Sequence, residues 1–403
     1  MALLPVADAL ARILKDVSPL DAESAPIAEA AGRTLAAPLA ATRTQPPFPA
    51  SAMDGYALRA ADVATAPAIL RLIGMSAAGR GFTGRVGSGE TVRIFTGAPV
   101  PDGADAIVLQ EDATADGDRV TMREAATPGR HIRRAGVDFE SGEILLEQGR
   151  RLDARAIGLA AAMGHGTLPV RRRPRVAILA TGDELVRPGE APGPDQIVMS
   201  NSYSIAALVA GTGGEPIDLG IATDDFPALE RGLRAARDAR ADILVTTGGA
   251  SVGDHDLVQS ALVKEGMRLD FWRIAMRPGK PLMFGALGPM RILGLPGNPV
   301  SSYVCSFLFL APLIRALLGD PRADEDRSET ARLGAPMPAN DTRAEYARAT
   351  LARDGDGTLV ATPVGTRDSS ITRLLAHADA LLIRPPFAPA APAGAPCRIL
   401  RLS

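Results

Sequence analysis

Cysteine and long apolar runs are scarce in this sequence, and their scarcity excludes two classes of protein. The 403 residues include only two cysteines, Cys305 and Cys397, which are too few for the disulfide framework of a small secreted protein. The longest apolar stretch, Val300–Leu318, is interrupted by serines, a proline and an arginine, so it does not predict a membrane span. The first residues show helical spacing in place of a signal-peptide pattern. We therefore expect a cytoplasmic protein without membrane contact.

Excess charge is also lacking, which argues against nucleic-acid binding. The formal net charge is −2 at pH 7, and no long basic stripe appears. The densest basic patch, Arg171–Arg173 with Arg175, falls between predicted domains, where a solvated linker is the expected explanation. Only three of the 44 basic residues are lysines. No nucleic acid is expected as a partner.

Changes of pattern along the chain predict a multidomain α/β plus β protein with four domains. Segments 1–46 and 140–172 are expected to form one α-rich linker domain, and segment 47–139 is expected to be inserted between them as a β domain. Segment 173–322 is predicted to be an α/β domain, and segment 323–403 a C-terminal β domain resembling a barrel.

Short runs of β-forming residues, separated by Gly and Asp, define the strands of the two predicted β domains. Residues 116 and 117, Asp-Gly, predict a hairpin turn. The expected strands are Ala68–Met75, Glu90–Phe95, Asp105–Gln110 and Arg119–Arg123 in the inserted domain, and Glu345–Leu351, Leu359–Thr362, Ala380–Ile383 and Arg398–Leu402 in the C-terminal domain.

The α/β segment predicts a doubly wound parallel sheet, because short all-apolar strands alternate with helical patterns. Three strands, Arg175–Ala180, Asp242–Val245 and Arg291–Leu295, run directly into loops. Ligands bind at the carboxyl ends of the strands in such sheets, so we expect the three loops to converge on one crevice. The intervening helices are predicted at Ser204–Ala210 with Gly211 as its C-cap, at Ala228–Ala239 and at Asp256–Glu265.

The loop TTGGASVGDHD at residues 246–256 is the most informative of the three. Gly248 and Gly249 let the backbone approach a ligand and adopt positive φ, and exposed N–H groups ahead of a helix form an anion cradle. Asp254 and Asp256 would repel an anion unless a metal ion lay between them. The loop favours a phosphorylated ligand held with a hard cation, although an ordinary strand-to-helix turn explains the glycines about as well.

Seven motifs, in order along essentially the whole chain, resemble those of one family. They are FPASAMDGYA (48–57), FTGAPVP (95–101), RRAGVDF (133–139), TGDEL (181–185), TTGGASVGDHD (246–256), RPGKP (277–281) and GLPGNPVS (294–301). Together they resemble the molybdopterin molybdenumtransferases, the MoeA family, which includes the gephyrin E domain. The resemblance implies an enzyme that inserts molybdate, its substrate, into adenylylated molybdopterin and releases AMP in a Mg²⁺-dependent reaction.

The same resemblance implies a homodimer with the active site at the subunit interface. It also suggests transient contacts with the adenylyltransferase and with proteins that mature molybdenum enzymes. Asp54, Thr96 and Asp138 match family positions that reach the active site from the partner subunit. A simple turn at Asp54-Gly55 is the alternative explanation for the first of them.

By resemblance, Glu184, Asp225 and Asp256 match acidic positions of the family's active site and are the expected Mg²⁺ ligands. Mg²⁺ prefers oxygen ligands and keeps several waters, so one or two direct carboxylates suffice. Asp183 and Asp225 also stand where helix N-caps are expected, and for Asp225 this alternative is about equally strong from the sequence.

The expected substrate-binding residues come from the three loops and from the C-terminal domain. Arg273 and Arg277, four apart in a predicted strand, should share one face; some family members carry Lys at these two positions. Asn298 can cap a helix that begins at Pro299. Ser370 is as plausible as Ser369 for the serine of the molybdate pocket, and an ordinary surface role is the alternative for it and for Arg348. The full set is Gly248, Gly249, Ser251, Gly253, Arg273, Arg277, Lys280, Pro296, Asn298, Pro299, Ser301, Arg348 and Ser369.

Two other functions remain open at this point. The α/β segment could belong to a molybdopterin adenylyltransferase, although small enzymes of that kind lack the flanking domains. The chain could also be a non-catalytic, gephyrin-like scaffold, a role that typically depends on extra domains and long linkers.

Overall fold

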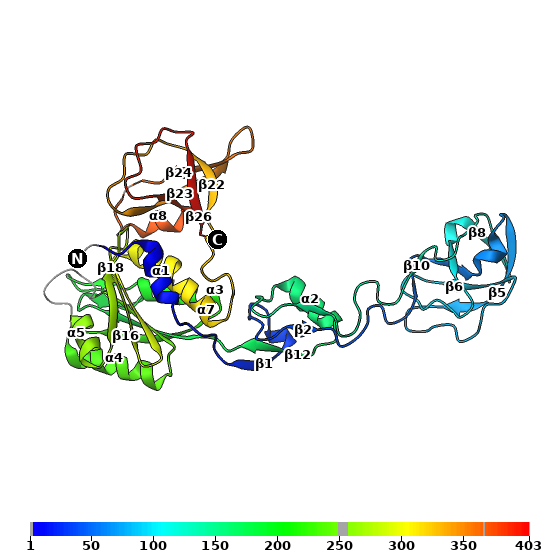
Figure 1. Cartoon of the computed structure of the whole chain (residues 1–403), viewed down its shortest axis with the longest axis horizontal. Coiled ribbons are helices and arrows are strands. Elements are labelled where there is room, and N and C mark those ends of the chain that lie inside the picture. Colours follow the sequence, from blue (N-terminus) through cyan, green and yellow to red (C-terminus); the bar gives the residue numbers. More distant parts are fainter. Residues whose placement is uncertain (1–2, 249–256, 366, 403) are drawn as a thin grey trace. The chain divides into compact units, whose positions relative to one another are not determined.

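The computed structural model describes residues 3–248, 257–365 and 367–402, and the chain forms two compact units (Figure 1). The larger unit contains Met1–Glu23, Gly32–Ala36 and Pro169–Ser403, and the smaller unit contains Ser24–Ala31 and Ala37–Leu168. The chain passes from one unit to the other along the paired strands β1 (Ala22–Pro26) and β12 (Thr167–Arg171). The finer division into four domains stays a prediction.

A six-stranded sheet in the order β7-β4-β6-β5-β9-β8 forms the core of the smaller unit. The four predicted strands of this segment are confirmed, and so is the hairpin, in which β8 and β9 pair antiparallel and Gly117 has a φ of 59°. Leu58, Val120 and Met122 are fully buried on one face. The strands are β4 (Gly55–Leu58), β5 (Ala68–Ser76), β6 (Glu90–Ile94), β7 (Ala106–Leu109), β8 (Ala113–Asp116) and β9 (Arg119–Met122).

The prediction of an α-rich linker domain is wrong, because helices are a minority in its two segments. In residues 140–172 the helix is α2 (Ala154–Ala162), capped by Asp153 Oδ1, which accepts from the N–H of Ala156 at 2.8 Å. Prolines between residues 19 and 49 interrupt the alanine-rich sequence and remove helical N–H donors. The remaining short elements are η1 (Ile27–Glu29), η2 (Ala60–Val63), η3 (Gln110–Asp112), β2 (Leu39–Ala40), β3 (Ala50–Ser51), β10 (Ile132–Arg133) and β11 (Ile144–Leu146).

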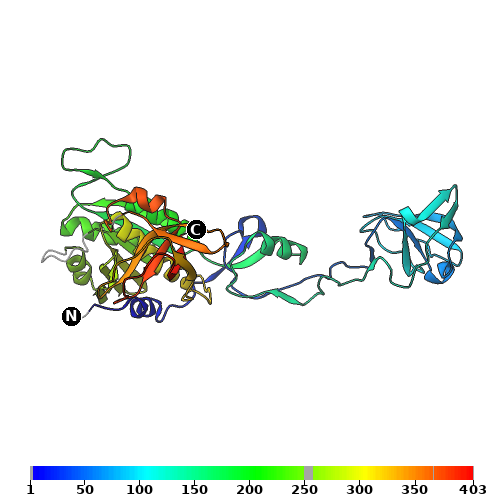
Figure 2. The same ribbon diagram turned by 90° about the horizontal axis from the view of Figure 1, so that it is seen from above.

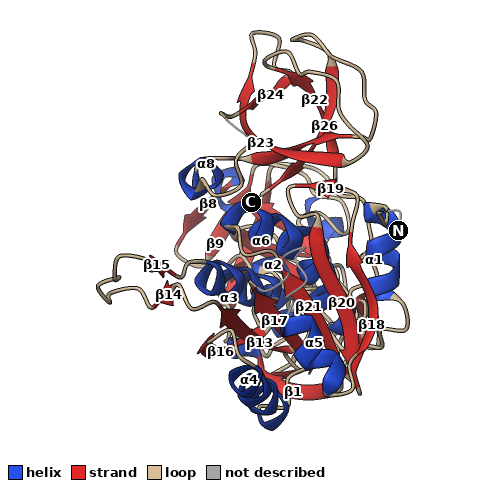
Figure 3. Ribbon diagram, turned by 90° about the vertical axis from the view of Figure 1, so that its left-hand side faces the viewer, coloured by secondary structure: helices blue, strands red, loops and turns tan. Residues whose placement is uncertain are grey.

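The larger unit contains a mixed sheet in the order β16-β13-β17-β21-β20-β18 (Figure 3). Its first four strands are parallel, as expected, but β20 is antiparallel to both neighbours. Only two residues, Gly288 and Pro289, connect β20 to β21, and a connection this short can join only antiparallel strands. The strands are β13 (Arg175–Thr181), β16 (Glu215–Ala222), β17 (Ile243–Thr247), β18 (Arg268–Arg273), β20 (Pro281–Leu287) and β21 (Met290–Leu295).

Helices cover both faces of this sheet, which confirms the doubly wound arrangement. Along β13, Val176 and Ile178 belong to one apolar core, and Ala177 and Leu179 belong to the other, as the two-residue period of a strand requires. Helices α1 (Val6–Leu14), α3 (Asn201–Thr212), α6 (Pro299–Cys305) and α7 (Ala311–Leu317), with η4 (Ser306–Leu310), cover the first face, and α4 (Phe226–Asp238) and α5 (Leu257–Lys264) cover the second.

The C-cap of α3 is Gly213, with a φ of 105°, so the predicted cap at Gly211 is two residues too early. The continuous helical run Pro299–Leu317 is long and apolar enough to cross a membrane, but 61% of it is buried inside the protein. Phe309, Leu313 and Ile314 are completely buried in the first core. This run is therefore a core helix of the larger unit.

The C-terminal segment forms a closed five-stranded barrel, as predicted. Its strands follow the order β23-β24-β22-β26-β25, and β25 pairs again with β23. Strand β19 (Met276–Arg277), from the α/β segment, adds to β23 in parallel and joins the two parts. The barrel strands are β22 (Glu329–Leu333), β23 (Ala344–Arg353), β24 (Leu359–Pro363), β25 (Ala380–Arg384) and β26 (Pro396–Arg401), with helix α8 (Thr372–Ala376) between β24 and β25.

Strands β14 (Leu185–Val186) and β15 (Ile197–Val198) form a small parallel pair after β13. The loop between them projects from the body of the larger unit, drawn in green at the upper left of Figure 2.

Candidate functional site

The three predicted loops begin side by side at the carboxyl ends of the parallel strands, as expected. Thr247, at the end of β17, is in register with Ala180 of β13 and Leu295 of β21. Gly248 follows with a φ of 94°, and a Cβ at this position would lie 2.4 Å from the carbonyl oxygen of Thr181. Only glycine fits here, so the first and second loops can start in contact.

The acidic residues at this edge have two arrangements: Asp225 caps helix α4, and Asp224 forms a cluster with Asp183 and Glu184. Asp225 is the N-cap of α4: its Oδ1 accepts from the N–H of Ala228 at 2.7 Å, and its Oδ2 accepts from the hydroxyl of Thr223 at 2.5 Å. These hydrogen bonds lower the pKa of the Asp225 carboxyl. The helix-cap alternative for Asp225 is therefore confirmed, and both of its carboxylate oxygens already have protein partners.

Asp224 is not among the candidates named from the sequence, but it faces other carboxylates. Its pKa is raised by burial and then by the negative charges of Asp183 and Glu184. Its backbone N–H also donates to Oδ1 of Asp183 at 3.1 Å. The cap geometry decides between the two adjacent aspartates: Asp225 caps α4, and Asp224 is left near Asp183 and Glu184.

This cluster fits a divalent cation only in part. Within residues 3–248, 257–365 and 367–402, no group of three His, Cys, Asp or Glu side chains is placed to hold a metal ion. Mg²⁺ needs only one or two carboxylates when phosphate oxygens and waters complete its shell, and mutual repulsion among carboxylates favours a cation. The predicted positions Gly249, Ser251, Gly253 and Asp256 lie outside the described residues.

The third loop is tied to the C-terminal segment. Asn298 occupies the N-cap position of α6, but its Nδ2 donates to Ser369 Oγ at 2.9 Å and makes no cap hydrogen bond. The N–H of Val300 donates to the carbonyl oxygen of Ser369 at 3.0 Å. Pro299 begins the helix as predicted, and Ser301 is buried in its first turn. These bonds fix Ser369 against the loop.

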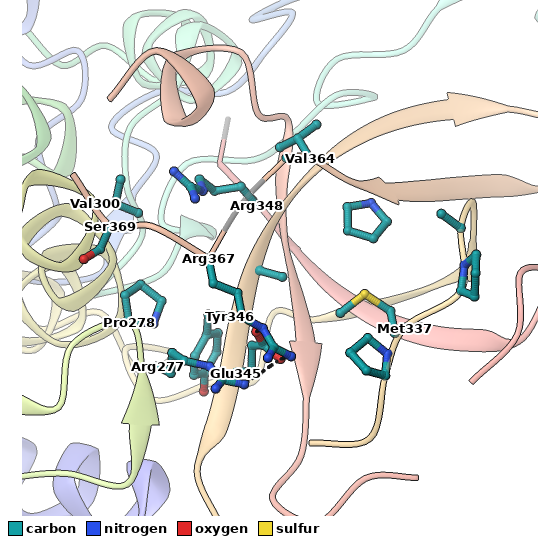
Figure 4. Close-up of a pocket in the computed structure, with 16 residues that line it drawn as sticks. Arg277, Pro278, Val300, Met337, Glu345, Tyr346, Arg348, Val364, Arg367 and Ser369 are labelled. Carbon is teal, nitrogen blue, oxygen red and sulfur yellow. Dashed lines mark hydrogen bonds and ion pairs between the residues drawn. The ribbon is translucent and has the colours of Figure 1, made fainter. Parts of the chain in front are cut away.

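A cavity of about 290 Å³ lies where the α/β part meets the barrel (Figure 4). We call it the junction cavity. Of the predicted residues, Arg277, Arg348 and Ser369 line it. As far as the described residues delimit it, Arg273, Lys280, Pro296, Asn298, Pro299 and Ser301 do not. Arg367 and Glu345, which were not predicted, complete its charged lining.

Glu345 holds two of the arginines on the cavity wall. It is 4% exposed, and its Oε2 lies 3.1 Å from Nη2 of Arg277, while its Oε1 lies 2.9 Å from Nε of Arg367. Arg277 also contacts Asp341 at 3.2 Å and donates to Oδ1 of Asn340 at 3.0 Å. A buried carboxylate shared in this way limits the orientations of both guanidinium groups.

Arg348 is fixed by backbone carbonyls. It is 5% exposed, and its Nη1 and Nη2 donate to the carbonyl oxygens of Ile371 at 3.0 Å and Asp368 at 2.9 Å. Burial lowers its pKa. Ser370 donates its hydroxyl to Oδ1 of Asp368 at 2.8 Å in a local turn, whereas Ser369 lines the cavity. The geometry therefore favours Ser369 over Ser370 as the pocket serine.

The predicted common face of Arg273 and Arg277 is wrong. Arg273 ends β18 of the α/β sheet, whereas Arg277 belongs to β19 of the barrel sheet. The chain leaves one sheet for the other within four residues, so the two-residue period breaks. The guanidinium of Arg273 lies 4.0 Å from the ring centroid of Trp272, and Lys280 is half-buried outside the cavity.

In the smaller unit, Asp54 and Thr96 are in direct contact despite their separation of 42 residues. Oδ1 of Asp54 accepts from both the N–H and the hydroxyl of Thr96 at 2.7 Å. These bonds lower the pKa of Asp54. Asp138 is exposed, and its N–H donates to the carbonyl oxygen of Gln45 at 3.1 Å.

Comparison with known proteins agrees with this architecture. Models of the MoeA N-terminal region (domain I and II), a probable molybdopterin binding domain and the MoeA C-terminal region (domain IV) match residues 4–164, 177–316 and 330–402. A solved molybdopterin biosynthesis MoeA protein from Pyrococcus horikoshii OT3 superposes with a TM-score of 0.84 at 28% identity, covering 99% of each chain.

Two curated relatives cover most of the chain. Molybdopterin molybdenumtransferase 2 of Mycobacterium tuberculosis is 37% identical over 370 residues, which is 89% of both chains. Molybdopterin molybdenumtransferase of Bacillus subtilis is 33% identical over 392 residues, covering 95% of this chain and 90% of its own length. With this similarity and the shared fold, the chain belongs to the molybdopterin molybdenumtransferase family.

Proposed function

We propose that this protein inserts molybdate into adenylylated molybdopterin and releases AMP, with Mg²⁺ as the cofactor. Family membership supports its place among the transferases of molybdenum cofactor biosynthesis. The junction cavity is the observation that carries the proposal further: three arginines and one glutamate line it, giving a net charge of +2. Molybdate is a dianion, so the cavity matches it in charge.

The chemistry assigned to the chain is mainly positioning and charge neutralisation. Arg348 and Ser369 present donors to the oxyanion, and Glu345 orients Arg277 and Arg367 beside it. Of the expected Mg²⁺ ligands, Glu184 and Asp225 lie among the described residues, and Asp183 and Asp224 are close to Glu184. One or two of these carboxylates would hold Mg²⁺ at the strand ends. When bound, Mg²⁺ neutralises phosphate charge. No side-chain nucleophile is required.

The proposal also includes a cytoplasmic homodimer in which the partner's copies of Asp54, Thr96 and Asp138 complete the site. One carboxylate oxygen of Asp54 accepts from both the N–H and the hydroxyl of Thr96, which supports a common role for these two residues. Transient contacts with the adenylyltransferase and with maturation proteins of molybdenum enzymes belong to the same proposal.

The decisive measurement is AMP release from adenylylated molybdopterin, with Mg²⁺ and molybdate each present or omitted. We expect release to require both ions. Arg348→Gln should lower molybdate-dependent release about 100-fold, because it removes a preorganised charged donor. Arg353→Gln, on the exposed end of the same strand β23, is the matched control and should retain activity. AMP release that does not depend on molybdate would contradict the proposal. Formation of adenylylated pterin from ATP would favour an adenylyltransferase activity.

A pair of serine variants tests the cavity more finely. Ser369→Ala removes a hydroxyl from the cavity lining and should weaken the molybdate response about threefold to tenfold, which corresponds to one hydrogen bond. Ser370→Ala removes only a local turn contact and should leave the response unchanged. A normal molybdate response in Ser369→Ala, with a weakened response in Ser370→Ala, would contradict the placement of the oxyanion beside Ser369.

A further inference from the structure

A second cavity, of about 480 Å³, lies at the opposite edge of the α/β sheet. We call it the amino-edge cavity, because β13 and β16 begin there at Arg175 and Glu215, and Arg240 lies three residues before β17. A strand of seven residues spans roughly 23 Å. A small ligand at this edge therefore cannot touch the loops at the carboxyl ends of the strands.

Arginines dominate its lining. Five of them, Arg33, Arg172, Arg173, Arg175 and Arg240, face two glutamates, Glu23 and Glu215. The predicted solvated linker at 171–175 is thus wrong in part, because these arginines are half-buried and three of them line a cavity. The lining carries a net charge of +3.

Nearby carboxylates neutralise only some of this charge. Arg172 donates to both oxygens of Asp242 at 2.7 and 2.8 Å, and this pairing raises the pKa of Arg172, with further contributions from Asp21 and Glu23. Arg175 lies 3.6 Å from Glu215. The side chains of Arg173 and Arg240 have no hydrogen bond or ion pair with any described residue. Positive charge remains in excess even after Asp242 and Asp21 are counted.

Arg33 contributes a buried charge to the same cavity. It is 8% exposed and contacts Glu23 and the carbonyl oxygen of Arg171, while its Nε has no partner within the described parts of the chain. A guanidinium group taken out of water is costly unless negative charge compensates it. One exposed glutamate supplies this only partly.

Arg240 occupies a backbone conformation that glycine would adopt with less strain. It follows α4 with a φ of 50°, in the left-handed region. A left-handed residue commonly ends a helix, and here the N–H of Ala241 donates to the carbonyl oxygen of Ala236 around the turn. Arg240 is exposed, and its side chain lines the amino-edge cavity.

We propose that the amino-edge cavity is a second anion site, which binds the phosphate or pyrophosphate group of a small phosphorylated ligand. Guanidinium groups match phosphate oxygens with paired hydrogen bonds, and the volume exceeds that of the junction cavity. Because this site is far from the strand-end loops, the proposal does not depend on the transferase reaction.

Calorimetric titration of the full-length protein with inorganic pyrophosphate at low salt tests the proposal, with inorganic phosphate and molybdate as separate arms. The double variant Arg173→Gln/Arg240→Gly should weaken pyrophosphate binding at least about tenfold, since two charged donors are lost. Arg231→Gln/Arg234→Gln, on the exposed face of α4, removes the same charge and should bind like the unmodified protein. In Arg348→Gln, where the proposed molybdate site is impaired, phosphate or pyrophosphate should bind more strongly than molybdate.

Two further variants keep the outcome decisive. Arg240→Gly relaxes the backbone, so its thermal midpoint should equal or exceed that of the unmodified protein while its anion binding falls. Arg348→Gln should leave pyrophosphate binding intact, which separates this site from the junction cavity. Equal affinity in the unmodified protein and in Arg173→Gln/Arg240→Gly, or an equal loss in the α4 control, would overturn the proposal.

Discussion

The two edges of the α/β sheet carry opposite imbalances of charge. At the carboxyl ends of the strands, burial and the negative charges of Asp183 and Glu184 raise the pKa of Asp224. At the amino ends, the excess charge is positive, and Arg173 and Arg240 have no side-chain partner among the described residues. These imbalances are the basis of the cation site proposed at one edge and of the anion site proposed at the other.

The junction cavity differs from both edges. Its arginines are already held: Glu345 bridges Arg277 and Arg367, and carbonyl oxygens hold Arg348. Preorganised donors do not have to reorient when an oxyanion arrives, which suits a catalytic pocket. Unpaired arginines such as Arg173 suit reversible binding instead.

The largest effect on stability should come from removing the ion pairs that Glu345 makes with Arg277 and Arg367 in the junction cavity. Glu345→Gln leaves Arg277 and Arg367 without their buried counter-charge and should lower the free energy of unfolding by about 2 kcal/mol; this is below the range for fully buried pairs because half of the Arg367 side chain is exposed. Urea unfolding measures it. Glu325→Gln, in the exposed pair with Arg322, is the control and should change little. If Glu345→Gln lowers the free energy of unfolding no more than Glu325→Gln does, the arginines of the junction cavity are not held more firmly than a surface pair. The contrast between the two cavities would then be contradicted.

A smaller effect on stability should follow from breaking the ion pair between Arg172 and Asp242 at the amino edge of the sheet. Asp242→Asn removes the charge that holds Arg172 and should lower the free energy of unfolding by about 1.5 kcal/mol. It also releases a third arginine, so pyrophosphate binding should become stronger. Asp238→Asn, at the exposed end of α4, is the control for both readouts. Weaker pyrophosphate binding in Asp242→Asn would argue against an anion site there.

The smallest effect concerns pH dependence at the carboxyl edge. The pKa of Asp224 is raised in the folded protein, so its contribution to stability is present below the unfolded pKa and is lost as the pH rises through the folded pKa. Asp224→Asn removes this loss. Its thermal midpoint should therefore exceed that of the unmodified protein at pH 7, and the difference should vanish near pH 3. Added Mg²⁺ should stabilise the unmodified protein more than the variant.

Asp225→Asn is the matched control for this measurement. Asparagine retains the helix cap, and the pKa of Asp225 is lowered rather than raised. A stability gain at pH 7 in Asp225→Asn, and none in Asp224→Asn, would reverse the assignment of cap and cluster.

Local patterns predicted most of the β structure. The strands of the smaller unit and of the barrel appear as short β-forming runs separated by Gly and Asp, and the Asp116-Gly117 hairpin follows from its turn chemistry. The adjacent starts of the three loops also followed, because parallel strands place their carboxyl ends together. Their convergence on one crevice stays a prediction, since residues 249–256 lie outside the described residues. The helical spacing of the first residues is confirmed by α1, but the α-rich interpretation of residues 1–46 is wrong beyond it, because prolines interrupt that segment.

The site was predicted less completely. Arg277 was named from a family motif, and Arg348 and Ser369 from their match to family positions in the C-terminal segment; all three line the junction cavity. Glu345 and Arg367 carry no local signal, since their importance depends on β19 joining the barrel beside β23. Asp224 was hidden by its neighbour, because only the cap geometry shows which of two adjacent aspartates is already occupied.

The family, the alternation of strands and helices, and the glycine positions where loops begin are readable from the amino-acid sequence, because these depend on residues close in the chain. The tertiary structure decided which charges are paired. Arg172 pairs with Asp242, seventy residues away in the chain, and Glu345 pairs with two arginines from separate segments. The side chain of Arg173 has no partner among the described residues. Electrostatic energy depends on distance in space and on burial, and neither is fixed by position in the chain.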